Sequence, residues 1–339
     1  MILDRGMAVL AIAALLQGIA VWAGTWAVLG LLTRFRIFDQ PNQRSSHTVA
    51  KPRGGGIALI PLILLGWSAW AIWSDNAPAG FWRIVPAAAL LAAVSWVDDL
   101  RNLPAGLRLA AQAVAVALGL SGFSGMGWVF QGFLPPLLDG LAAALLWLWF
   151  INLFNFMDGI DGISGVEALS VGVGLTLAAG LAGLAPELVT LPLLLAAAAL
   201  GFLFWNWPPA RLFLGDVGSV PLGYLLGWLL LLAAAQGQWA VALILPLYYL
   251  ADASLTLARR TLRGAKIWRA HREHAYQRAA KGGLKHGAVT GRVLLCNGVL
   301  IACAGTAAAG WPWPALAGAF VAVAILLADL ERHAARGGD

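Results

Sequence analysis

Two adjacent carboxylates lie where an apolar run meets a polar loop. In VSWVDDLRNL these are Asp98 and Asp99. Like charges this close raise the proton affinity of one member or attract a divalent cation. The alternative is an ordinary helix end at a membrane surface, where an Asp is tolerated. The pair is therefore a candidate for acid-base or metal chemistry.

A second polar cluster repeats amides and carboxylates at three-residue spacing. INLFNFMDGIDGISG contains Asn152, Asn155, Asp158 and Asp161. Helical spacing would place them on one face, and the glycines after each carboxylate allow backbone to approach a ligand closely. A solvated polar loop would explain the composition of this segment but not its spacing, so we interpret it as a binding segment.

A third segment, NWPPARLFLGDVGS, is bracketed by Asn206 and Asp216. Asp216 falls just inside the membrane surface, where an unpaired carboxylate is costly, so a cation is its natural partner. One or two carboxylates together with substrate phosphates are the usual ligands of Mg²⁺. An N-cap for the following helix is the alternative.

Two basic segments could bind phosphate. Lys51 and Arg53 precede three glycines at the start of an apolar run, and backbone N–H groups at a helix start favour anions. His271, Arg272 and His274 lie in the longest basic loop. Two His make a poor zinc site, but together with Arg they suit a diphosphate. A basic amphipathic helix attracted to anionic lipid is the alternative for this loop.

The composition shows what kind of protein must position these residues. Of the 339 residues, 60% are apolar and 11% charged, and the mean hydropathy is +0.80, whereas a soluble domain carries roughly 25% charge. This excludes a soluble globular enzyme. The net charge of +6 is then a topology signal rather than a sign of nucleic-acid binding, and membrane lipids are the expected surroundings. We find no repeat or linker, so residues 1–339 are predicted to form one transmembrane domain.

Eleven apolar runs are long enough, or nearly so, to cross a hydrocarbon core of roughly 30 Å. They lie at 7–33, 55–73, 83–98, 108–121, 137–154, 166–184, 188–205, 219–235, 239–258, 291–309 and 315–330. The loops form two sets, and one set holds all of the 22 Lys and Arg residues except Arg5 and Arg83. Because basic loops stay in the cytoplasm, we predict an all-α polytopic protein with about eleven transmembrane helices, a periplasmic N-terminus and a cytoplasmic C-terminus.

Four ordered motifs, VDDLRNL, NFMDGIDGISG, LFLGDVGS and HREHAYQR, resemble those of the polyprenyl-phosphate N-acetylhexosamine-1-phosphate transferases. The resemblance implies a bacterial inner-membrane enzyme whose active site faces the cytoplasm. It would transfer a sugar-1-phosphate from a UDP-HexNAc donor to undecaprenyl phosphate, with Mg²⁺ required and Mn²⁺ able to substitute. It further implies that Asp98 and Asp99 are the catalytic aspartates and that Asp216 is the metal ligand.

The remaining site residues implied by the resemblance fall into two groups. Those lining the nucleotide pocket are Lys51, Asn155, Asp158, Asp161, Asn206 and Phe213, and those binding phosphate or sugar are Arg108, His271, Arg272 and His274. Peptidoglycan members carry consecutive histidines where this chain has HREHAYQR, which is similar instead to WbpL-type enzymes that initiate O-antigen synthesis with FucNAc or QuiNAc donors. A homodimer is compatible with the family.

An ion-coupled secondary transporter that uses Asp98, Asp99 and Asp216 is the alternative function. Transporters place ionisable groups near the bilayer midplane. Here these groups lie at the predicted cytoplasmic ends of the spans, which favours the enzyme. The short third and fourth spans, moreover, are predicted to leave a groove through which a prenyl chain could reach the site.

Overall fold

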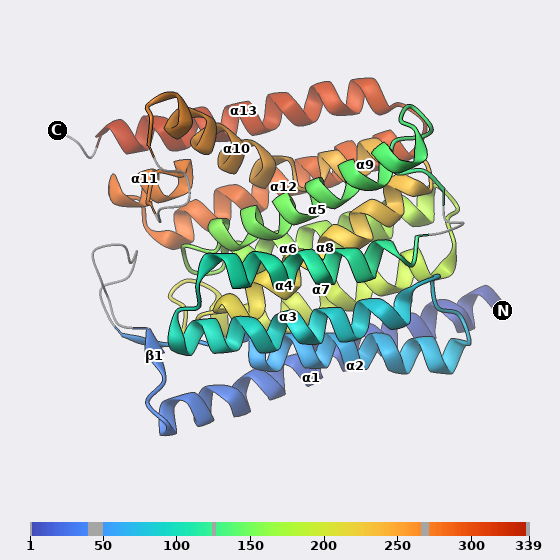
Figure 1. Cartoon of the computed structure of the whole chain (residues 1–339), viewed down its shortest axis with the longest axis horizontal. Helices are drawn as coiled ribbons and strands as arrows, with labels where there is room; N and C mark the ends of the chain where they lie inside the picture. The colour runs from blue at the N-terminus through green and yellow to red at the C-terminus, as the bar shows by residue number, and fades with distance from the viewer. Residues whose placement is uncertain (1, 40–49, 124–126, 266–270, 337–339) are drawn as a thin grey trace.

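The long apolar runs become helices because a helix satisfies its backbone hydrogen bonds within its own segment, which the bilayer core demands. The structure is a computed structural model that describes residues 2–39, 50–123, 127–265 and 271–336. Its helices run roughly side by side along one axis (Figure 1). The chain is an all-α polytopic membrane protein, as the sequence predicts.

The helices are α1 (Ile2–Arg34), α2 (Gly56–Ser74), α3 (Phe81–Arg101), α4 (Ala105–Leu120), α5 (Pro136–Met157), α6 (Ile163–Leu181), α7 (Pro186–Asn206), α8 (Asp216–Ala235), α9 (Trp239–Ile244), α10 (Leu247–Leu262), α11 (Ala275–Lys281), α12 (His286–Ala308) and α13 (Pro312–Arg336). Two short strands, β1 (Phe38–Asp39) and β2 (Lys51–Pro52), pair antiparallel. They fix the chain between α1 and α2.

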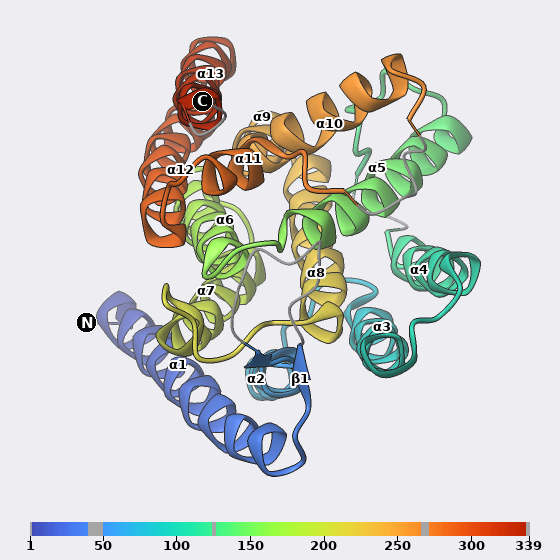
Figure 2. The same ribbon diagram turned by 90° about the vertical axis from the view of Figure 1, so that its left-hand side faces the viewer.

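Nine helices of the described chain are long and apolar enough to cross a membrane, against eleven predicted spans. The predicted span 108–121 corresponds to α4, which has only 16 residues. The prediction of one continuous span at 239–258 is wrong. That segment divides into α9 and α10 on either side of Pro246, because proline lacks the N–H that a continuing helix needs. In the end-on view of Figure 2, α10 runs across the picture rather than along the bundle.

Helix α8 forms the centre of the bundle. All 18 residues of its most apolar window are buried, and Figure 2 shows it surrounded by other helices. Its first turn approaches α2 unusually closely, since a Cβ on Gly56 would lie 2.2 Å from the backbone nitrogen of Gly218. Only glycine permits such an approach. Asp216 therefore begins the most buried of the membrane-crossing helices.

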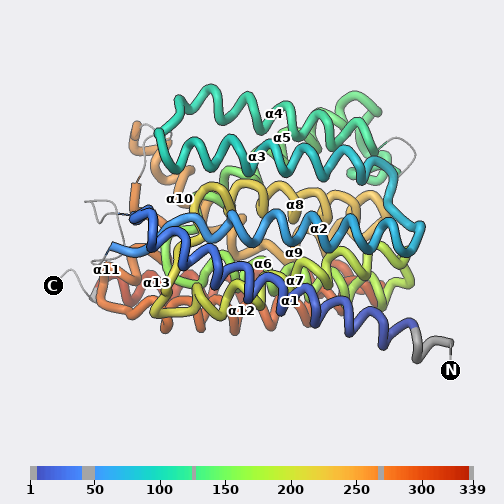
Figure 3. Tube along the Cα trace, turned by 90° about the horizontal axis from the view of Figure 1, so that it is seen from below, coloured from blue at the N-terminus to red at the C-terminus, as the bar shows by residue number. Residues whose placement is uncertain are grey.

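The predicted division of the loops into two sets corresponds to the two ends of the bundle. At one end Arg53 contacts Asp216, and Lys51 contacts Asp161. At the other end Asn76 hydrogen bonds to Glu187. Figure 3 shows α10 and α11 gathered at the end opposite to the start of α1. The described beginning of α1 and the described end of α13 thus lie at opposite ends of the bundle.

We expect the end with α11 to face the cytoplasm, because it holds the basic loops. In a protein whose two cysteines are replaced by Ser, single Cys probes at Ala105 and Lys281 should react only with reagents that reach the cytoplasm. Probes at Ala79 and Ala309 should react only from outside. All four positions are exposed. Outside labelling of Lys281→Cys would contradict this orientation.

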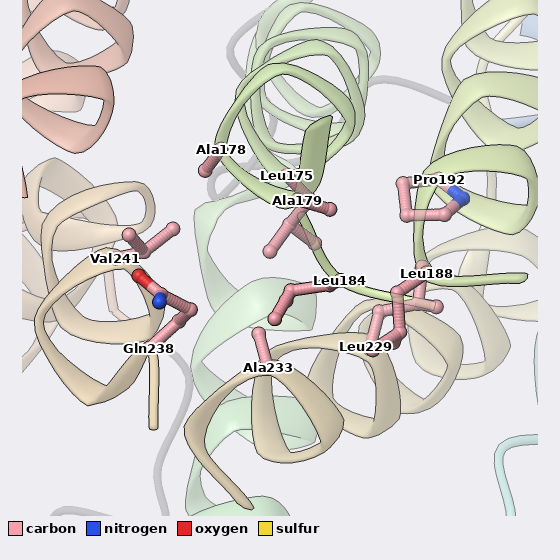
Figure 4. A pocket seen from close by; sticks show the side chains of 10 residues that line it. All are labelled: Leu175, Ala178, Ala179, Leu184, Leu188, Pro192, Leu229, Ala233, Gln238 and Val241. Carbon is pink, nitrogen blue, oxygen red and sulfur yellow. The ribbon is translucent and has the colours of Figure 1, made fainter. Parts of the chain in front are cut away.

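Two spaces differ greatly in size. A cavity of about 10 Å³ between α6, α7, α8 and α9 is lined by mostly apolar side chains (Figure 4), and it can hold at most about one water molecule. A second space, which we call the lateral groove, measures about 790 Å³ and is lined by the 129–134 segment, α5, α8, α9 and the start of α13. The sequence placed such a groove at the third and fourth spans. The lateral groove lies elsewhere, beside α5 and α9 and next to the break at Pro246, so it does not test that prediction.

Candidate active site

Asp99 and Asp216 meet at the start of α8. The Asp99 carboxylate accepts hydrogen bonds from the backbone N–H of Asp216 at 3.1 Å and of Val217 at 2.9 Å. It therefore caps α8 from another helix and supplies negative charge where the helix dipole favours it. Arg53 Nη2 lies 2.8 Å from Asp99 Oδ1 and 2.8 Å from Asp216 Oδ1. The two carboxylates share one guanidinium.

Asp98 points to a different neighbourhood from Asp99. Its carboxylate accepts a hydrogen bond from the Leu103 N–H at 2.7 Å and pairs with Arg108 at 3.0 Å. Consecutive residues on a helix do not face each other. The prediction that the adjacent aspartates act on one another is therefore not supported by their geometry. Asp98 instead fixes the loop between α3 and α4 and orients Arg108.

Asp158 follows α5 and lies close enough to Asp99 and Asp216 for their charges to interact. Burial is the main cause that raises its pKa to about 7, and repulsion by Asp216 contributes, although a hydrogen bond with Ser164 opposes the shift. Asp158 thus takes up a proton near neutral pH. A cation placed among these carboxylates would favour its charged form.

Asp161 behaves in the opposite way. Burial would raise the pKa of this carboxyl, but a hydrogen bond from His286, the Ala210 N–H at 2.9 Å and the charge of Lys51 together lower it to about 2. Asp161 therefore remains ionised and ties Lys51 and His286 to the turn before α6. Lys51 Nζ also lies 5.3 Å from the centre of the Phe213 ring. His286 was not among the site residues predicted from the sequence.

Asn155 and Asn206, whose side-chain amides were predicted to line the nucleotide pocket, form hydrogen bonds with other residues of the protein. Asn155 donates to Ser219 Oγ at 2.8 Å. The buried Asn206 accepts from the Gly162 N–H at 3.0 Å and donates to the Leu212 carbonyl at 2.8 Å. Asn206 therefore fastens the third motif to the second, a role that differs from the predicted contact with a nucleotide.

The HREHAYQR motif is anchored by a buried carboxylate that the sequence reasoning missed. Asp252 of α10 is 1% exposed and accepts hydrogen bonds from the Ala275 N–H at 2.8 Å and the Tyr276 N–H at 3.4 Å. Its Oδ1 also lies 3.6 Å from His274 Nδ1. His274 is itself only 2% exposed and caps α11. It is therefore a structural residue of this loop in the observed geometry, not an open ligand contact.

His271 precedes this anchored segment and its ring lies 4.9 Å from that of His274. Burial, together with the neighbouring His274 and Arg260, lowers the pKa of His271 to about 4. A neutral imidazole provides hydrogen bonds but no positive charge at pH 7. His271 therefore adds no positive charge toward a diphosphate at neutral pH, whereas Arg272 carries one.

The oxygen donors near Asp216 fit a hard divalent cation. No group of three His, Cys, Asp or Glu side chains converges as a ready-made metal site within the described ranges. Mg²⁺ does not require one, because it is commonly held by one or two carboxylates and substrate phosphates. Burial, with a smaller contribution from Asp216 and Asp99, raises the pKa of Asp158, and a cation bound here would offset the repulsion among these carboxylates. The side chain of Asp216 is 22% exposed, against 3% for that of Asp99, so it is the more accessible of these two carboxylates.

The comparisons with known proteins agree with these motifs. A family model described as Glycosyl transferase family 4 matches residues 81–234. Over 296 residues the chain is 29% identical to the probable undecaprenyl-phosphate N-acetylglucosaminyl 1-phosphate transferase of Bacillus subtilis, covering 84% of this chain and 81% of that protein. The chain is thus similar, over most of its length, to the polyprenyl-phosphate N-acetylhexosamine-1-phosphate transferases.

Other relatives of this transferase fall into two named groups. The decaprenyl-phosphate N-acetylglucosaminephosphotransferase of Mycolicibacterium smegmatis is 27% identical over 323 residues, covering 82% of this chain and 77% of that protein. The phospho-N-acetylmuramoyl-pentapeptide-transferase of Deinococcus radiodurans is 27% identical over 273 residues, covering 72% of this chain and 84% of that protein. The similarity thus extends to both kinds of enzyme.

Tyr276 joins the fourth motif of the transferase to the second. Its hydroxyl donates to the Phe156 carbonyl at 3.2 Å and accepts from the Gly159 N–H. We expect Tyr276→Phe to lower the free energy of unfolding by about 1–2 kcal/mol, because buried backbone groups lose their partner. It should also raise the KM for the nucleotide sugar severalfold with a smaller change in kcat, since the Asp158 turn loses its support.

Tyr224→Phe is the matched control for this prediction. Tyr224 makes an equivalent buried hydrogen bond to the Ala115 carbonyl at 3.0 Å, away from the loops. Its loss should lower stability and leave KM unchanged. Equal KM values for Tyr276→Phe and wild type would show that this bond does not shape the donor site. Initial rates against donor concentration and thermal unfolding provide both readouts.

Proposed function

We propose that this transferase moves HexNAc-1-phosphate from a UDP-HexNAc to undecaprenyl phosphate. An oxygen of the lipid phosphate forms a bond to the β-phosphorus of the UDP-sugar. The bond from that phosphorus to the bridging oxygen breaks, which releases UMP and leaves undecaprenyl-diphospho-sugar. The observation that carries the proposal is the meeting of Asp99, Asp216 and Arg53 at the loop end of an apolar bundle.

Each substrate-facing residue has a task consistent with its surroundings. Phe213 is suited to stack on uracil, and Lys51, which lies over its ring, is placed to bind the adjoining phosphate. Arg108, held by Asp98 at 3.0 Å, can bind the lipid phosphate. Phosphoryl transfer depends mainly on positioning and on neutralising charge. Basic groups held by buried carboxylates meet both needs.

A divalent cation, Mg²⁺ or Mn²⁺, supplies further neutralisation of the diphosphate when bound. Asp216 would hold it, with Asp158 as a second carboxylate. Asp99 contributes differently, because its oxygens already accept two backbone N–H groups and contact Arg53. We assign Asp99 to positioning the first turn of α8, and Asp98 to positioning Arg108.

The lateral groove is the proposed path of the prenyl chain. Its lining is apolar and includes Phe150 and Leu250. Phe150 precedes Asp158 by eight residues, which corresponds to about 12 Å along a helix. A phosphate at the carboxylates could therefore be continuous with an isoprenoid chain lying beside α5. The chain would enter from the bilayer while the nucleotide enters from the aqueous end.

The donor and the pathway are proposed from the HREHAYQR motif. Its similarity to WbpL-type enzymes favours a 6-deoxy-HexNAc donor such as UDP-FucNAc or UDP-QuiNAc and a role in starting O-antigen or a related envelope polysaccharide. The names of the Bacillus and Mycolicibacterium relatives point to GlcNAc as the competing donor.

We propose that the protein lies in the bacterial plasma membrane with its site on the cytoplasmic face. The transporter alternative gains no support, since the aspartates lie at one end of the bundle.

Release of UMP tests the reaction and identifies the donor. Purified protein in nanodiscs should release UMP only when Mg²⁺ or Mn²⁺, undecaprenyl phosphate and the correct UDP-sugar are all present. A panel of UDP-GlcNAc, UDP-GalNAc, UDP-FucNAc and UDP-QuiNAc distinguishes the donors. Reactions without lipid phosphate measure hydrolysis alone. Absence of lipid-dependent UMP release with every donor would exclude the proposed reaction for these sugars.

A further inference from the structure

The backbone that carries Arg53 is fixed against the third motif. The Phe213 carbonyl accepts hydrogen bonds from the N–H of Gly54 at 3.1 Å and of Gly55 at 2.9 Å, and the Phe213 N–H donates to the Pro52 carbonyl at 2.9 Å. The Arg53 side chain therefore starts from a defined point beside the GDVGS turn. A change in the contacts of Arg53 therefore needs only a change in its side-chain conformation.

One nitrogen of Arg53 stands between the two carboxylates. Nη2 lies 2.8 Å from Asp99 Oδ1 and 2.8 Å from Asp216 Oδ1, so the two oxygens are no further apart than twice that distance. Carboxylate oxygens bind Mg²⁺ at about 2.0–2.1 Å. A cation that reached Asp216 on the side facing Asp99 would therefore need the space that Nη2 fills.

Asp99 is held by groups other than the guanidinium. Besides its contact with Arg53, its carboxylate accepts two backbone hydrogen bonds from α8. The Arg53 side chain is 34% exposed, and its Nη1 lies 3.9 Å from Asp39 Oδ1 on β1. The Asp39 side chain is 27% exposed and lies within ion-pair distance of the guanidinium. The Arg53 guanidinium thus has a third carboxylate, that of Asp39, within reach.

We infer that Arg53 is a displaceable counter-ion, which neutralises Asp99 and Asp216 when no divalent cation is bound and shifts toward Asp39 when one binds. This inference rests on the proposed use of a divalent cation at Asp216. The guanidinium keeps two carboxylates together that would otherwise repel each other. Cation binding has to displace it, so the apparent affinity of the free protein for the cation is lower than the carboxylates alone would give.

Substitutions at Arg53 and Asp39 should then act in opposite directions. Arg53→Gln removes the competitor and should tighten binding of Mn²⁺ to the substrate-free protein by about tenfold, as expected for removing one nearby charge at partial burial. Arg53→Lys, which keeps the charge but lacks the planar fork, should tighten it by about threefold. Asp39→Asn removes the alternative partner and should weaken binding.

A double variant separates this mechanism from a general loss of negative charge. If Asp39 acts through Arg53, Asp39→Asn has no effect on Mn²⁺ affinity in the Arg53→Gln background. If it acts by simple attraction of the cation, the weakening persists there. Arg211→Gln is the matched control, because Arg211 is exposed and lies over the Trp205 ring at 5.6 Å rather than between carboxylates. The Arg211→Gln protein should bind Mn²⁺ with the same affinity as the wild type.

Electron paramagnetic resonance of free Mn²⁺ measures these affinities without substrate or turnover. Protein in nanodiscs of zwitterionic lipid avoids cation binding to anionic headgroups, and thermal unfolding confirms that each variant is folded. Wild-type protein that binds no Mn²⁺ would refute the proposed cation site itself. Wild-type binding with unchanged or weaker affinity in Arg53→Gln would overturn the counter-ion inference alone. Should Arg53→Gln not fold, unchanged or weaker affinity in Arg53→Lys overturns it equally.

Discussion

Replacing Asp216 with Asn should reduce lipid-dependent UMP release by at least about a hundredfold, the scale seen when one electrostatic contact to a transition state is removed. Asn has the same size, and the backbone N–H groups of residues 216 and 217 still donate to Asp99. The fold should therefore persist while the proposed cation ligand is lost. UMP release and thermal unfolding, measured on the same preparation, check both parts.

Asp139→Asn provides the matched control for Asp216→Asn. Asp139 is a carboxylate that is only 5% exposed, and it accepts hydrogen bonds from the N–H groups of Val129 and Phe130 near the far end of the bundle. The change should lower stability and leave the metal dependence of the remaining turnover unaltered. Near-normal turnover of Asp216→Asn with intact metal dependence would show that Asp216 is not the ligand.

Gly56→Ala should cause a large loss of stability from the addition of one methyl group. A Cβ at this position would lie 2.2 Å from the Gly218 nitrogen, so α2 and α8 must separate. Overpacking of this kind costs about 1–3 kcal/mol. Because Gly56 follows Arg53 by three residues and Gly218 follows Asp216 by two, the separation should also reduce UMP release.

Gly106→Ala is the control for this second prediction. Nothing lies within 4 Å of a Cβ at Gly106 in α4, so the substitution should stabilise the helix by roughly 0.5–1 kcal/mol. Thermal unfolding distinguishes the opposite signs. A Gly56→Ala protein that unfolds at the wild-type temperature and retains full turnover would show that the α2–α8 approach is not required.

The sequence predicted the elements well because hydrophobicity alone sets a membrane helix. The long apolar runs correspond to helices such as α1, α2 and α5, which are long and apolar enough to cross a membrane. The two sets of loops lie at opposite ends of the bundle, as the distribution of their basic residues indicated. The error at 239–258 came from reading total hydrophobicity and passing over Pro246. That proline was a visible local signal.

The site was only partly predictable, because partners depend on packing between distant segments. Adjacent numbering suggested that Asp98 and Asp99 act as a pair, although helical geometry already points neighbours in different directions. The contact of Arg53 with Asp99 and Asp216 joins residues far apart in the chain, and no local sequence pattern predicts it. Asp252 did leave a signal, since it is a lone acid in the apolar segment YYLADASL.

The two proposed substrates have separate approaches to the protein. The lateral groove lies beside α5, α8 and α9, whereas Phe213 and Lys51 lie together at the loop end of the bundle. In the proposed reaction, a hydrophobic inhibitor lodged beside α5 would compete with the lipid and spare binding of the nucleotide. A uridine analogue would do the reverse. A molecule that linked an apolar chain to a uridine moiety would occupy both regions. Resistance to such a molecule would then require changes in two separate parts of the chain.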